Sequence, residues 1–589
     1  MRKPGLYVAI FAGVFLSIPG GTSVAQTTDA AKNPWPCPAS DLEHWVRRFA
    51  VDRADLSRFY DLPYSEECEG RIEAFDREAE GKLQGMAFDE MNMQGKIDYW
   101  LMLRYLHYEE CLRRRAAGRL VEMAELLPFR EGILKLELGR RRMERCDPRA
   151  AAGVLAEIPG RLKELRKKYE PAPEEAAQPA DSFGPVTALR AAGAAERLRG
   201  VLECWYSFYG EFQPEFAWWV QSPYEKACES LTEYATFLRE TIAGMKGGEE
   251  DPLIGMPIGA EALAEELEHE FLGTTPGDLI AIGERELAWC EGEMKKAAGE
   301  MGFGEDWKAA LERVKESYVP PGEQDDLVEE EGRGAIAFLK EHDLLTIPAL
   351  CEETWNVQML SLDSQKYLPF AAYGGQKMLV AYPTAEMPFE DKLMAMRGNN
   401  RYFTRLVTPH ELIPGHHLQG FMAERYREYR SIFGTPFFGE GWALYWELTL
   451  WEQGYARTPE ERVGMLFWRM HRAARIVVSL KFHLGEMAPE EMIQYLMDRV
   501  GHERLGATNE VRRYISDGYS PLYQCGYLIG GLQLRALREE VLARKLMSER
   551  EFHDRLLTYG AIPIALIRAD MLAEGGMTGT APEWKFSEP

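Results

Sequence analysis

Apolar residues recur at the period of an α-helix through most of this chain, and that pattern restricts its fold more than any other feature. One apolar stripe runs from Ile97 to Tyr108, and a second runs from Leu466 to Leu480. Alternation typical of a β-strand is scarce, and its best candidate is the segment 377–382, closed by Pro383. We therefore expect a mainly α fold with at most a small β element.

The first residues have the layout of a secretory signal peptide. Arg2 and Lys3 precede an apolar run from Leu6 to Ile18, and the small residues around Ala25 offer a cleavage site. The run is shorter than the ~20 residues that span a bilayer comfortably, and no cysteine follows it as a lipid attachment point. We predict a signal peptide at 1–25 and an exported protein, periplasmic or extracellular, with no membrane anchor after cleavage.

Charge and cysteine content exclude some functions. The net charge of −25 repels a phosphate backbone, so we expect no nucleic-acid partner. The nine cysteines include no C-x-x-C pair, which argues against a thiolate zinc site. Cys37 and Cys68 are candidates for a disulfide in an oxidising compartment, and buried single thiols are an equally good interpretation.

Proline- and glycine-rich breaks divide the helical blocks. They fall at 171–185, 247–259 and 320–322. We expect a mainly helical N-terminal region at 26–350 and a helical catalytic region at 351–589, joined as one compact unit.

Three of the eleven histidines lie within eight residues, at His410, His416 and His417. Catalytic zinc takes histidine or carboxylate ligands and keeps one position open for water. Glu411, next to the first histidine, is placed to take a proton from that water. The pattern resembles the H-E-x-x-H helix, in which two histidines share one face.

The histidine spacing departs from that helix. Residues i and i+6 of a straight helix lie ~9 Å apart along its axis, which is too far for two ligands of one zinc ion. Pro414 breaks a helix and Gly415 tolerates unusual dihedrals, so a kink here is expected to return His416 or His417 toward His410. An alternative is that Thr408 begins a helix as a capping box and the later histidines are surface residues.

A third ligand is offered downstream. Glu440 and Glu447 lie in an apolar helical run, where a carboxylate is costly unless it is paired or bound to metal. Glu440 also suits the first turn of a helix, where the helix dipole favours an acid.

These motifs resemble the bacterial domain-of-unknown-function 885 family. The resemblance rests on H-E-L-I-P-G-H-H-L-Q at 410–419 and E-G-W-A-L-Y-W-E at 440–447, supported by segments at 475–483, 527–530 and 552–563. The family is similar to gluzincin zinc peptidases with a helical, two-lobed architecture like that of thimet-type oligopeptidases and a deep cleft.

That resemblance implies a ligand set. His410, one of the next two histidines and Glu440 would hold zinc, and Glu411 would be the general base. The separation between the second histidine and the glutamate in that group favours His416. The chain departs from the family pattern at Ser479 to Lys481, at Tyr523 and at Leu528.

Three further residues are candidates for catalysis or substrate binding. Tyr527 or His483 could stabilise an oxyanion, since both side chains can donate a hydrogen bond. Arg475 could bind a substrate carboxylate with two hydrogen bonds, although a structural ion pair is a strong alternative.

The sequence therefore predicts an exported zinc-dependent metallopeptidase that hydrolyses oligopeptides or peptide C-termini. Its expected cofactor is zinc and its expected partner is a peptide substrate. The departures from the family pattern leave open a zinc amidohydrolase acting on non-peptide amides or modified amino-acid conjugates. A non-catalytic, zinc-stabilised binding protein is a third interpretation.

Overall fold

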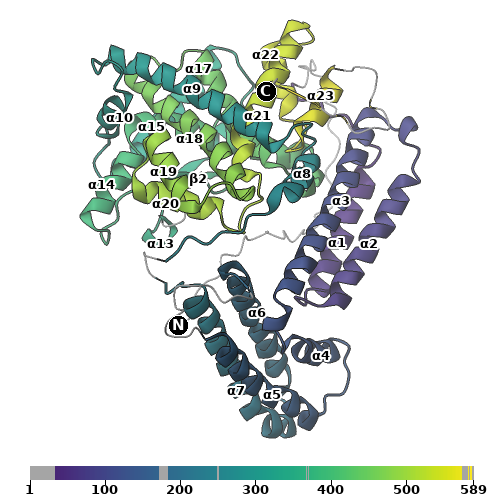
Figure 1. The fold of residues 1–589 in the computed structure, drawn as a ribbon. Coiled ribbons are helices and arrows are strands. Elements are labelled where there is room, and N and C mark those ends of the chain that lie inside the picture. Colours follow the sequence, from purple (N-terminus) through teal and green to yellow (C-terminus); the bar gives the residue numbers. More distant parts are fainter. Residues whose placement is uncertain are drawn as a thin grey trace.

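Helices make up most of the chain, as the apolar periodicity predicts (Figure 1). The computed structural model describes residues 34–170, 183–247, 251–365, 368, 370–572, 577, 582 and 584–586. The predicted signal peptide at 1–25 lies outside these residues. The mainly α fold with a small β element is confirmed.

Three long helices form the N-terminal segment, drawn in purple in Figure 1. Ser65 and Asn92 begin two of them, because their side-chain oxygens accept backbone N–H groups of the first turn. The helices and the neighbouring short turns are α1 (Glu43–Phe59), α2 (Glu66–Gln84), η1 (Phe88–Glu90), α3 (Met93–Glu122) and η2 (Ala124–Leu126).

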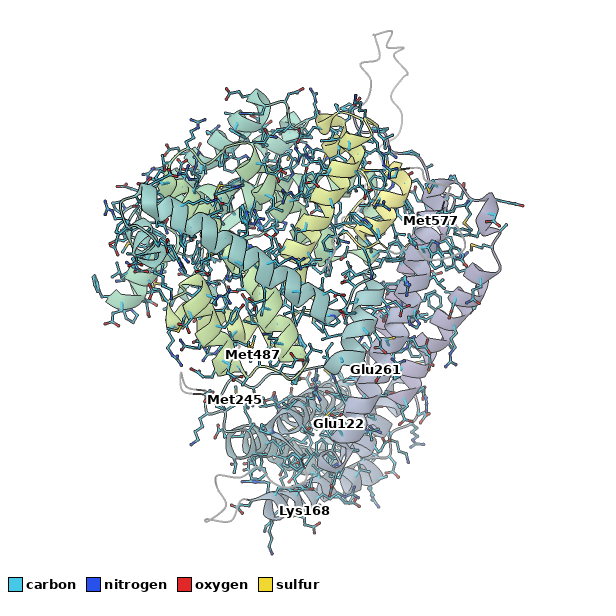
Figure 2. All side chains as sticks on the ribbon, turned by 45° about the horizontal axis from the view of Figure 1, so that its top comes forward. Glu122, Lys168, Met245, Glu261, Met487 and Met577 are labelled. Atoms are coloured by element: carbon cyan, nitrogen blue, oxygen red, sulfur yellow. The ribbon has the colours of Figure 1, made fainter. Side chains whose placement is uncertain are left out.

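A smaller helical bundle follows, at the bottom of Figure 1. Its helices are α4 (Arg130–Arg141), α5 (Pro148–Tyr169), α6 (Pro185–Gly210) and α7 (Pro214–Thr236), continued by η3 (Phe237–Ile242). Proline stands at the first position of the last three helices, where its missing N–H costs nothing. The bundle has its own hydrophobic core, which includes Trp205. Glu122 at the end of α3 lies beside the bundle (Figure 2) and pairs with Arg190 of α6 at 3.2 Å.

The remaining helices build the larger unit around α18 (Pro459–His483), which is buried along most of its length. Helix α18 packs against α9, α15, α19 and α21. The other helices of this unit are α8 (Gly259–His269), α9 (Pro276–Glu300), α10 (Trp307–Lys315), α11 (Gln324–Glu341), α12 (Ala349–Glu353), α13 (Leu362–Gln365), α14 (Phe389–Gly398), α15 (Arg401–Glu411), α16 (His416–Tyr426), η4 (Glu428–Phe433), α17 (Pro436–Glu452), α19 (Pro489–Val500), α20 (Arg504–Tyr514), α21 (Tyr523–Ala543), α22 (Glu549–Leu556) and α23 (Ile564–Leu572).

One hydrophobic core joins the larger unit to the N-terminal helices. It contains residues from Leu42 to Trp584 and includes side chains of α9 and α11 as well as those of α15 and α18. We expected the catalytic region to begin after residue 350. Helices before and after that residue share this core.

A three-stranded sheet lies within the larger unit, in the order β1 (Asn356–Met359), β3 (Lys377–Val380), β2 (Ala371–Tyr373). Strand β3 is the one that the sequence predicts. It pairs in parallel with β1 and antiparallel with β2. Gly375 has a φ of +67°, which suits the tight turn between β2 and β3. This leaves β2 at an edge of the sheet.

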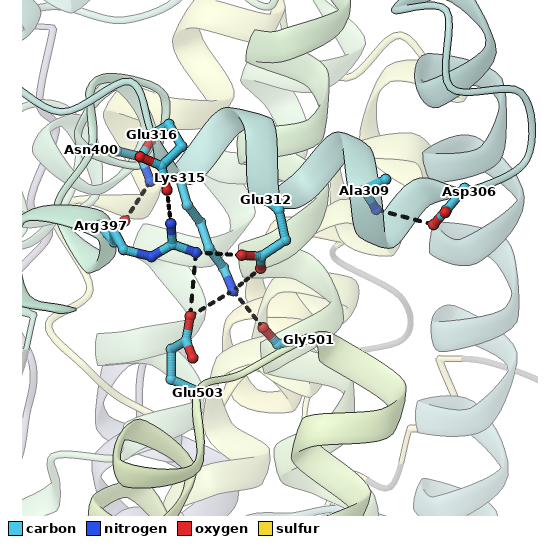
Figure 3. Close-up of polar contacts among 9 residues, drawn as sticks. All are labelled: Asp306, Ala309, Glu312, Lys315, Glu316, Arg397, Asn400, Gly501 and Glu503. Atoms are coloured by element: carbon cyan, nitrogen blue, oxygen red, sulfur yellow. Dashed lines mark hydrogen bonds and ion pairs between the residues drawn. The ribbon is translucent and has the colours of Figure 1, made fainter. Parts of the chain in front are cut away.

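A buried lysine fixes the position of α20 relative to α10. The ammonium of Lys315 contacts Glu312 at 2.8 Å, the carbonyl of Gly501 at 2.9 Å and Glu503 at 3.5 Å (Figure 3). Arg397 of α14 contacts Glu503 at 3.4 Å and also pairs with Glu312. These partners compensate the buried positive charge of Lys315. They also link α10 to Gly501 and to Glu503 at the start of α20.

Cys37 and Cys68 form no disulfide, so of the two interpretations that the sequence leaves open, single thiols are the one present. The Sγ atom of Cys37 lies 3.2 Å from a guanidinium nitrogen of Arg427 in the larger unit. Cys68 is buried in the core of the smaller bundle instead. Cys37 is exposed beside Arg427 and Cys68 is buried in the bundle, so the two thiols lie in different parts of the fold and do not pair.

No helix among the described residues is both long enough and apolar enough to cross a membrane.

Candidate metal centre

The histidine motif lies at a break between two helices. Helix α15 ends at Glu411, and α16 begins at His416. Leu412 has a φ of −104° and a ψ of −108°, which is far from helical values. The expected break at Pro414 is therefore present. The alternative in which Thr408 begins a helix is wrong, because Thr408 lies in the last turn of α15.

Gly415 is required by a close backbone approach. A Cβ atom on this residue would lie 1.8 Å from the carbonyl oxygen of His410. The Gly415 N–H donates to the carbonyl of Pro409 at 2.9 Å. The indole N–H of Trp442 in α17 donates to the carbonyl of Pro414 at 2.8 Å. The φ of Gly415 is −76°, so the lack of a side chain matters here rather than a left-handed backbone.

The break brings two histidine rings together. The ring centroids of His410 and His416 are 4.9 Å apart. Ligand atoms of His410, Glu411 and His416 all lie within 4.8 Å of one another. In a straight helix the same residues would be separated by ~9 Å along the axis.

His417 faces away from this cluster. Its Nε2 atom lies 2.9 Å from the carbonyl oxygen of Cys351, and its Nδ1 atom lies 3.3 Å from the hydroxyl of Tyr373. Both ring nitrogens are therefore engaged elsewhere. Of the two histidines that the sequence left open, His416 is the one whose ring reaches the cluster.

Glu440 completes the set from the first turns of α17. Its Oε2 atom lies 3.1 Å from Nε2 of His416 and 3.8 Å from Nε2 of His410. This oxygen is buried and has no hydrogen-bond partner of good geometry among the described residues. Such an atom is costly to bury unless a cation satisfies it.

These three residues fit a tetrahedral metal ion. Zinc binds histidine nitrogen and carboxylate oxygen at ~2.0–2.2 Å, so two ligands of one tetrahedral ion lie about 3.4 Å apart. The observed separations of 3.1 and 3.8 Å bracket that value. Two imidazoles and one carboxylate also leave a fourth position open, as catalytic sites require.

Glu447 orients the first histidine. Its Oε1 atom lies 2.7 Å from Nδ1 of His410, which directs the Nε2 atom of that ring toward Glu440. Burial alone would raise the pKa of Glu447, but Arg472 and His410 lower it. Arg472 lies 3.4 Å from the same carboxylate. The carboxylate therefore stays ionised and holds the ring in place.

The cluster itself favours the ionised form of Glu440. Burial opposes that charge, yet His416 and His410 hold the pKa of Glu440 well below its usual range. A deprotonated carboxylate is the form that binds metal.

Close packing of α17 on α21 places two tyrosines beside Glu440. A Cβ atom on Gly530 would lie 1.9 Å from the carbonyl oxygen of Phe437, so only glycine allows this approach. Tyr523 donates its hydroxyl to Glu440. The ring of Tyr527 lies nearly parallel to that of His410, with centroids 6.3 Å apart.

The cluster opens into a cavity of about 320 Å³. Of the residues proposed from the sequence, Glu411, Tyr527 and Arg475 line it together with His410, His416 and Glu440. All lining residues lie between 368 and 527. This cavity is therefore formed within the larger unit and not as a cleft between the two hydrophobic cores.

His483 does not reach this cavity. It ends α18, two turns beyond Arg475 and ~12 Å farther along the axis, and it does not line the cavity wall. Burial lowers the pKa of His483 to about 4. His483 is therefore not among the predicted residues that the structure brings together at this cavity.

Several cavity residues were not predicted from the sequence, and Tyr523 and Arg513 are among them. Tyr523 lies four residues before Tyr527 on one helix face, and that spacing was a usable signal. Arg513 is on α20, whose position relative to the histidines depends on tertiary packing, so no local pattern identifies it.

The chain belongs to the family described as "Bacterial protein of unknown function (DUF885)", whose sequence profile matches residues 55–571. No curated protein matches the sequence. The structure is similar to a candidate lipoprotein of unknown function from Shewanella oneidensis, with 19% identity and a TM-score of 0.65, covering 91% of this chain and 100% of that one. It is also similar to a candidate lipoprotein from Colwellia psychrerythraea, with 16% identity and a TM-score of 0.57, covering 90% and 97%. At these sequence identities the similarity establishes a shared fold and does not establish an activity.

Proposed function

We propose that this protein is an exported, zinc-dependent peptidase of gluzincin type. The observation that supports this proposal is the convergence of two imidazoles and one carboxylate, at ligand spacing, with Glu411 beside them in the same cavity. Bound zinc supplies a Lewis acid that polarises a carbonyl group and lowers the pKa of water. This combination is suited to hydrolysis of an amide.

The chain's own residues have separate roles in the proposed reaction. Glu411 accepts the proton of the attacking water and later delivers it to the leaving amine. Its position next to His410 and its low exposure of 7% favour this role. Tyr527 lines the cavity, and its hydroxyl is the proposed donor to the oxyanion.

The sheet edge favours a peptide as the substrate. Residues Ala371 to Tyr373 of edge strand β2 line the same cavity as the metal cluster. An extended peptide can add to an exposed strand edge through main-chain hydrogen bonds. A compact non-peptide amide would gain little from such an edge.

The non-peptide alternative loses part of its support. Ser479 and Leu528, two of the departures from the family pattern that motivated it, are buried and do not line the cavity. Tyr523 does line it, but there it donates a hydrogen bond to the proposed ligand Glu440. The third interpretation, a non-catalytic binding protein, does not explain a general base next to the ligands.

Export is supported by two independent observations. The sequence begins with the layout of a signal peptide. The similar structures come from proteins described as candidate lipoproteins, which are exported.

The proposal is tested by mass spectrometry of a diverse peptide pool incubated with the zinc-loaded protein. We expect defined cleavages that disappear after chelation and fall by about 10²–10⁴-fold in Glu411→Gln, because the proton acceptor is lost. Glu424→Gln, an exposed change on α16, is the matched control and should keep full activity.

Cleavage by Glu411→Gln at the rate of the unmodified protein would refute the mechanism. No cleavage by protein with a full complement of zinc, together with hydrolysis of small acyl amides, would favour the amidohydrolase instead.

A further inference from the structure

Three arginines line the cavity beside the metal cluster, on two helices. Arg472 and Arg475 come from α18, and Arg513 comes from α20. A guanidinium is always charged and presents a planar set of donors that matches a carboxylate. In a chain with a net charge of −25, three cations in one small cavity need an explanation.

Arg475, the residue that the sequence suggests for binding substrate, is already occupied. Its Nη2 atom donates to Glu510 at 2.9 Å, and its Nε atom donates to the hydroxyl of Tyr514 at 2.8 Å. Burial would raise the pKa of Glu510, but Arg475 and Arg513 lower it to about 2. Arg475 therefore has a permanent counter-ion inside the protein.

Arg472 also has a counter-ion. Its Nη2 atom lies 3.4 Å from Glu447, the carboxylate that orients His410. The guanidinium carbon lies 4.6 Å from the ring centroid of Tyr527. These contacts account for its charge and position.

Arg513 differs from both. Within the part of the chain that the structure describes, it forms no ion pair with a carboxylate within 4 Å. Its Nε atom is buried without a hydrogen-bond partner, as are Nε of Arg472 and Nη1 of Arg475. Its guanidinium carbon lies 4.8 Å from the ring centroid of Tyr519 and 5.9 Å from that of Tyr523, and its Nη2 atom donates to the hydroxyl of Tyr527 at 3.3 Å. Tyrosines hold this cation in place, and the nearby carboxylate of Glu510 is in direct contact with Arg475 instead.

These tyrosines connect Arg513 directly to the metal cluster. Tyr523 donates to Glu440, and the ring of Tyr527 lies against that of His410. The guanidinium of Arg513 is therefore separated from the candidate ligands by these tyrosine side chains. The cavity of about 320 Å³ is at the small end of the range for ligand sites, which suits the end of a chain better than a chain passing through.

We propose that Arg513 binds the free C-terminal carboxylate of the substrate, so that the enzyme removes short pieces from peptide C-termini. This inference rests on the proposed peptidase function and specifies its substrate class. A carboxylate with two oxygens would give the guanidinium of Arg513 the direct ion pair that Glu510 gives to Arg475.

The test compares pairs of peptides that differ only in a free or amidated C-terminus, at saturating zinc. We expect the free acids to be cleaved about 100-fold more efficiently in kcat/KM, because the amide cannot pair with the buried charge. We also expect products shortened from the C-terminal end. This comparison needs no variant and therefore does not depend on whether a mutant folds.

Variants locate the effect. Arg513→Gln should lose most of the preference for the free acid, chiefly through a higher KM for the free-acid peptides. Arg512→Gln, its exposed neighbour on the same helix, is the control and should keep the full preference.

The outcomes separate the two proposals. Amides cleaved as efficiently as acids, with cleavage still dependent on Glu411, would overturn the role of Arg513 and leave the peptidase proposal intact. Equal preference in Arg513→Gln and the unmodified enzyme would also overturn it. No Glu411-dependent cleavage of either series would remove both proposals.

Discussion

At the scale of single residues, the lack of a side chain at Gly415 governs the distance between His410 and His416. Gly415 lies so close to the carbonyl of His410 that any Cβ atom would overlap the backbone. Backbone atoms cannot move aside as the end of a flexible side chain can. A larger residue here must therefore open the break and change the distance between His410 and His416.

We predict that Gly415→Ala destabilises the protein by about 3 kcal/mol or more and weakens zinc binding, because the break must open. Gly420→Ala is the matched control on the same helix, where nothing lies within 4 Å of an added Cβ atom. That change should be neutral or stabilise by up to ~1 kcal/mol. Urea unfolding and zinc titration measure both effects, and equal behaviour of the two variants would contradict this account.

The sequence identified several candidate site residues, but it did not identify the distant residues that they contact. The break at Pro414 and the third candidate ligand, Glu440, could both be inferred, since proline chemistry and buried carboxylates have local signatures. The exclusion of His417 could not, because it depends on the carbonyl of Cys351, 66 residues away in the chain. The position of Arg513 depends in the same way on long-range packing.

At the scale of elements, helix α17 is held at its first turn by a buried acid. Thr435 caps this helix by accepting the N–H of Phe437 at 3.1 Å, and its hydroxyl donates to Glu270. Burial raises the pKa of Glu270 to about 8. The folded protein thus keeps this carboxyl protonated at pH values where the unfolded chain ionises it.

Glu270 makes the free energy of unfolding depend on pH. Between the ordinary pKa of a glutamate, about 4.5, and the pKa of about 8 in the fold, the folded state binds more protons than the unfolded chain. The contribution of Glu270 to the free energy of unfolding is therefore full below pH 4.5 and is lost as the pH rises to 8. We predict that Glu270→Gln stabilises the protein by the order of 3 kcal/mol at pH 8 and hardly at all at pH 4. Urea unfolding at both pH values measures this. A stabilisation that is the same at the two values would show that Glu270 is ionised in the fold.

The helical character and strand β3 were predictable because periodicity is a local property. The neighbours of each helix were not. The contact of α17 with α21 depends on glycines at Gly441 and Gly530, which face each other across 89 residues of sequence. Nothing near either glycine indicates its partner.

At the scale of the whole molecule, the candidate metal centre and the smaller bundle belong to different hydrophobic cores. The core of α4 to α7 includes residues from Leu62 to Leu238, whereas all cavity residues belong to the larger unit. We infer that the bundle can lose stability without disturbing the site.

We predict that Trp205→Ala, in the core of the bundle, costs ~3–5 kcal/mol of stability in that unit and leaves the zinc content unchanged. Trp218→Ala is the matched control, since this tryptophan is 83% exposed, and it should change stability by less than ~0.5 kcal/mol. Calorimetry and metal analysis of folded protein measure both quantities. Loss of zinc from folded Trp205→Ala protein would show that the two units are coupled.

The central claim is that His410, His416 and Glu440 hold one metal ion, and metal content tests it most directly. Elemental mass spectrometry of protein equilibrated with zinc and then desalted would be compared for the unmodified chain, His416→Gln and His417→Gln. We predict one zinc ion per chain in the unmodified protein and in His417→Gln, because the ring of His417 faces Cys351 and Tyr373. His416→Gln should retain much less. Full zinc content in His416→Gln, or none in the unmodified protein, would contradict the claim.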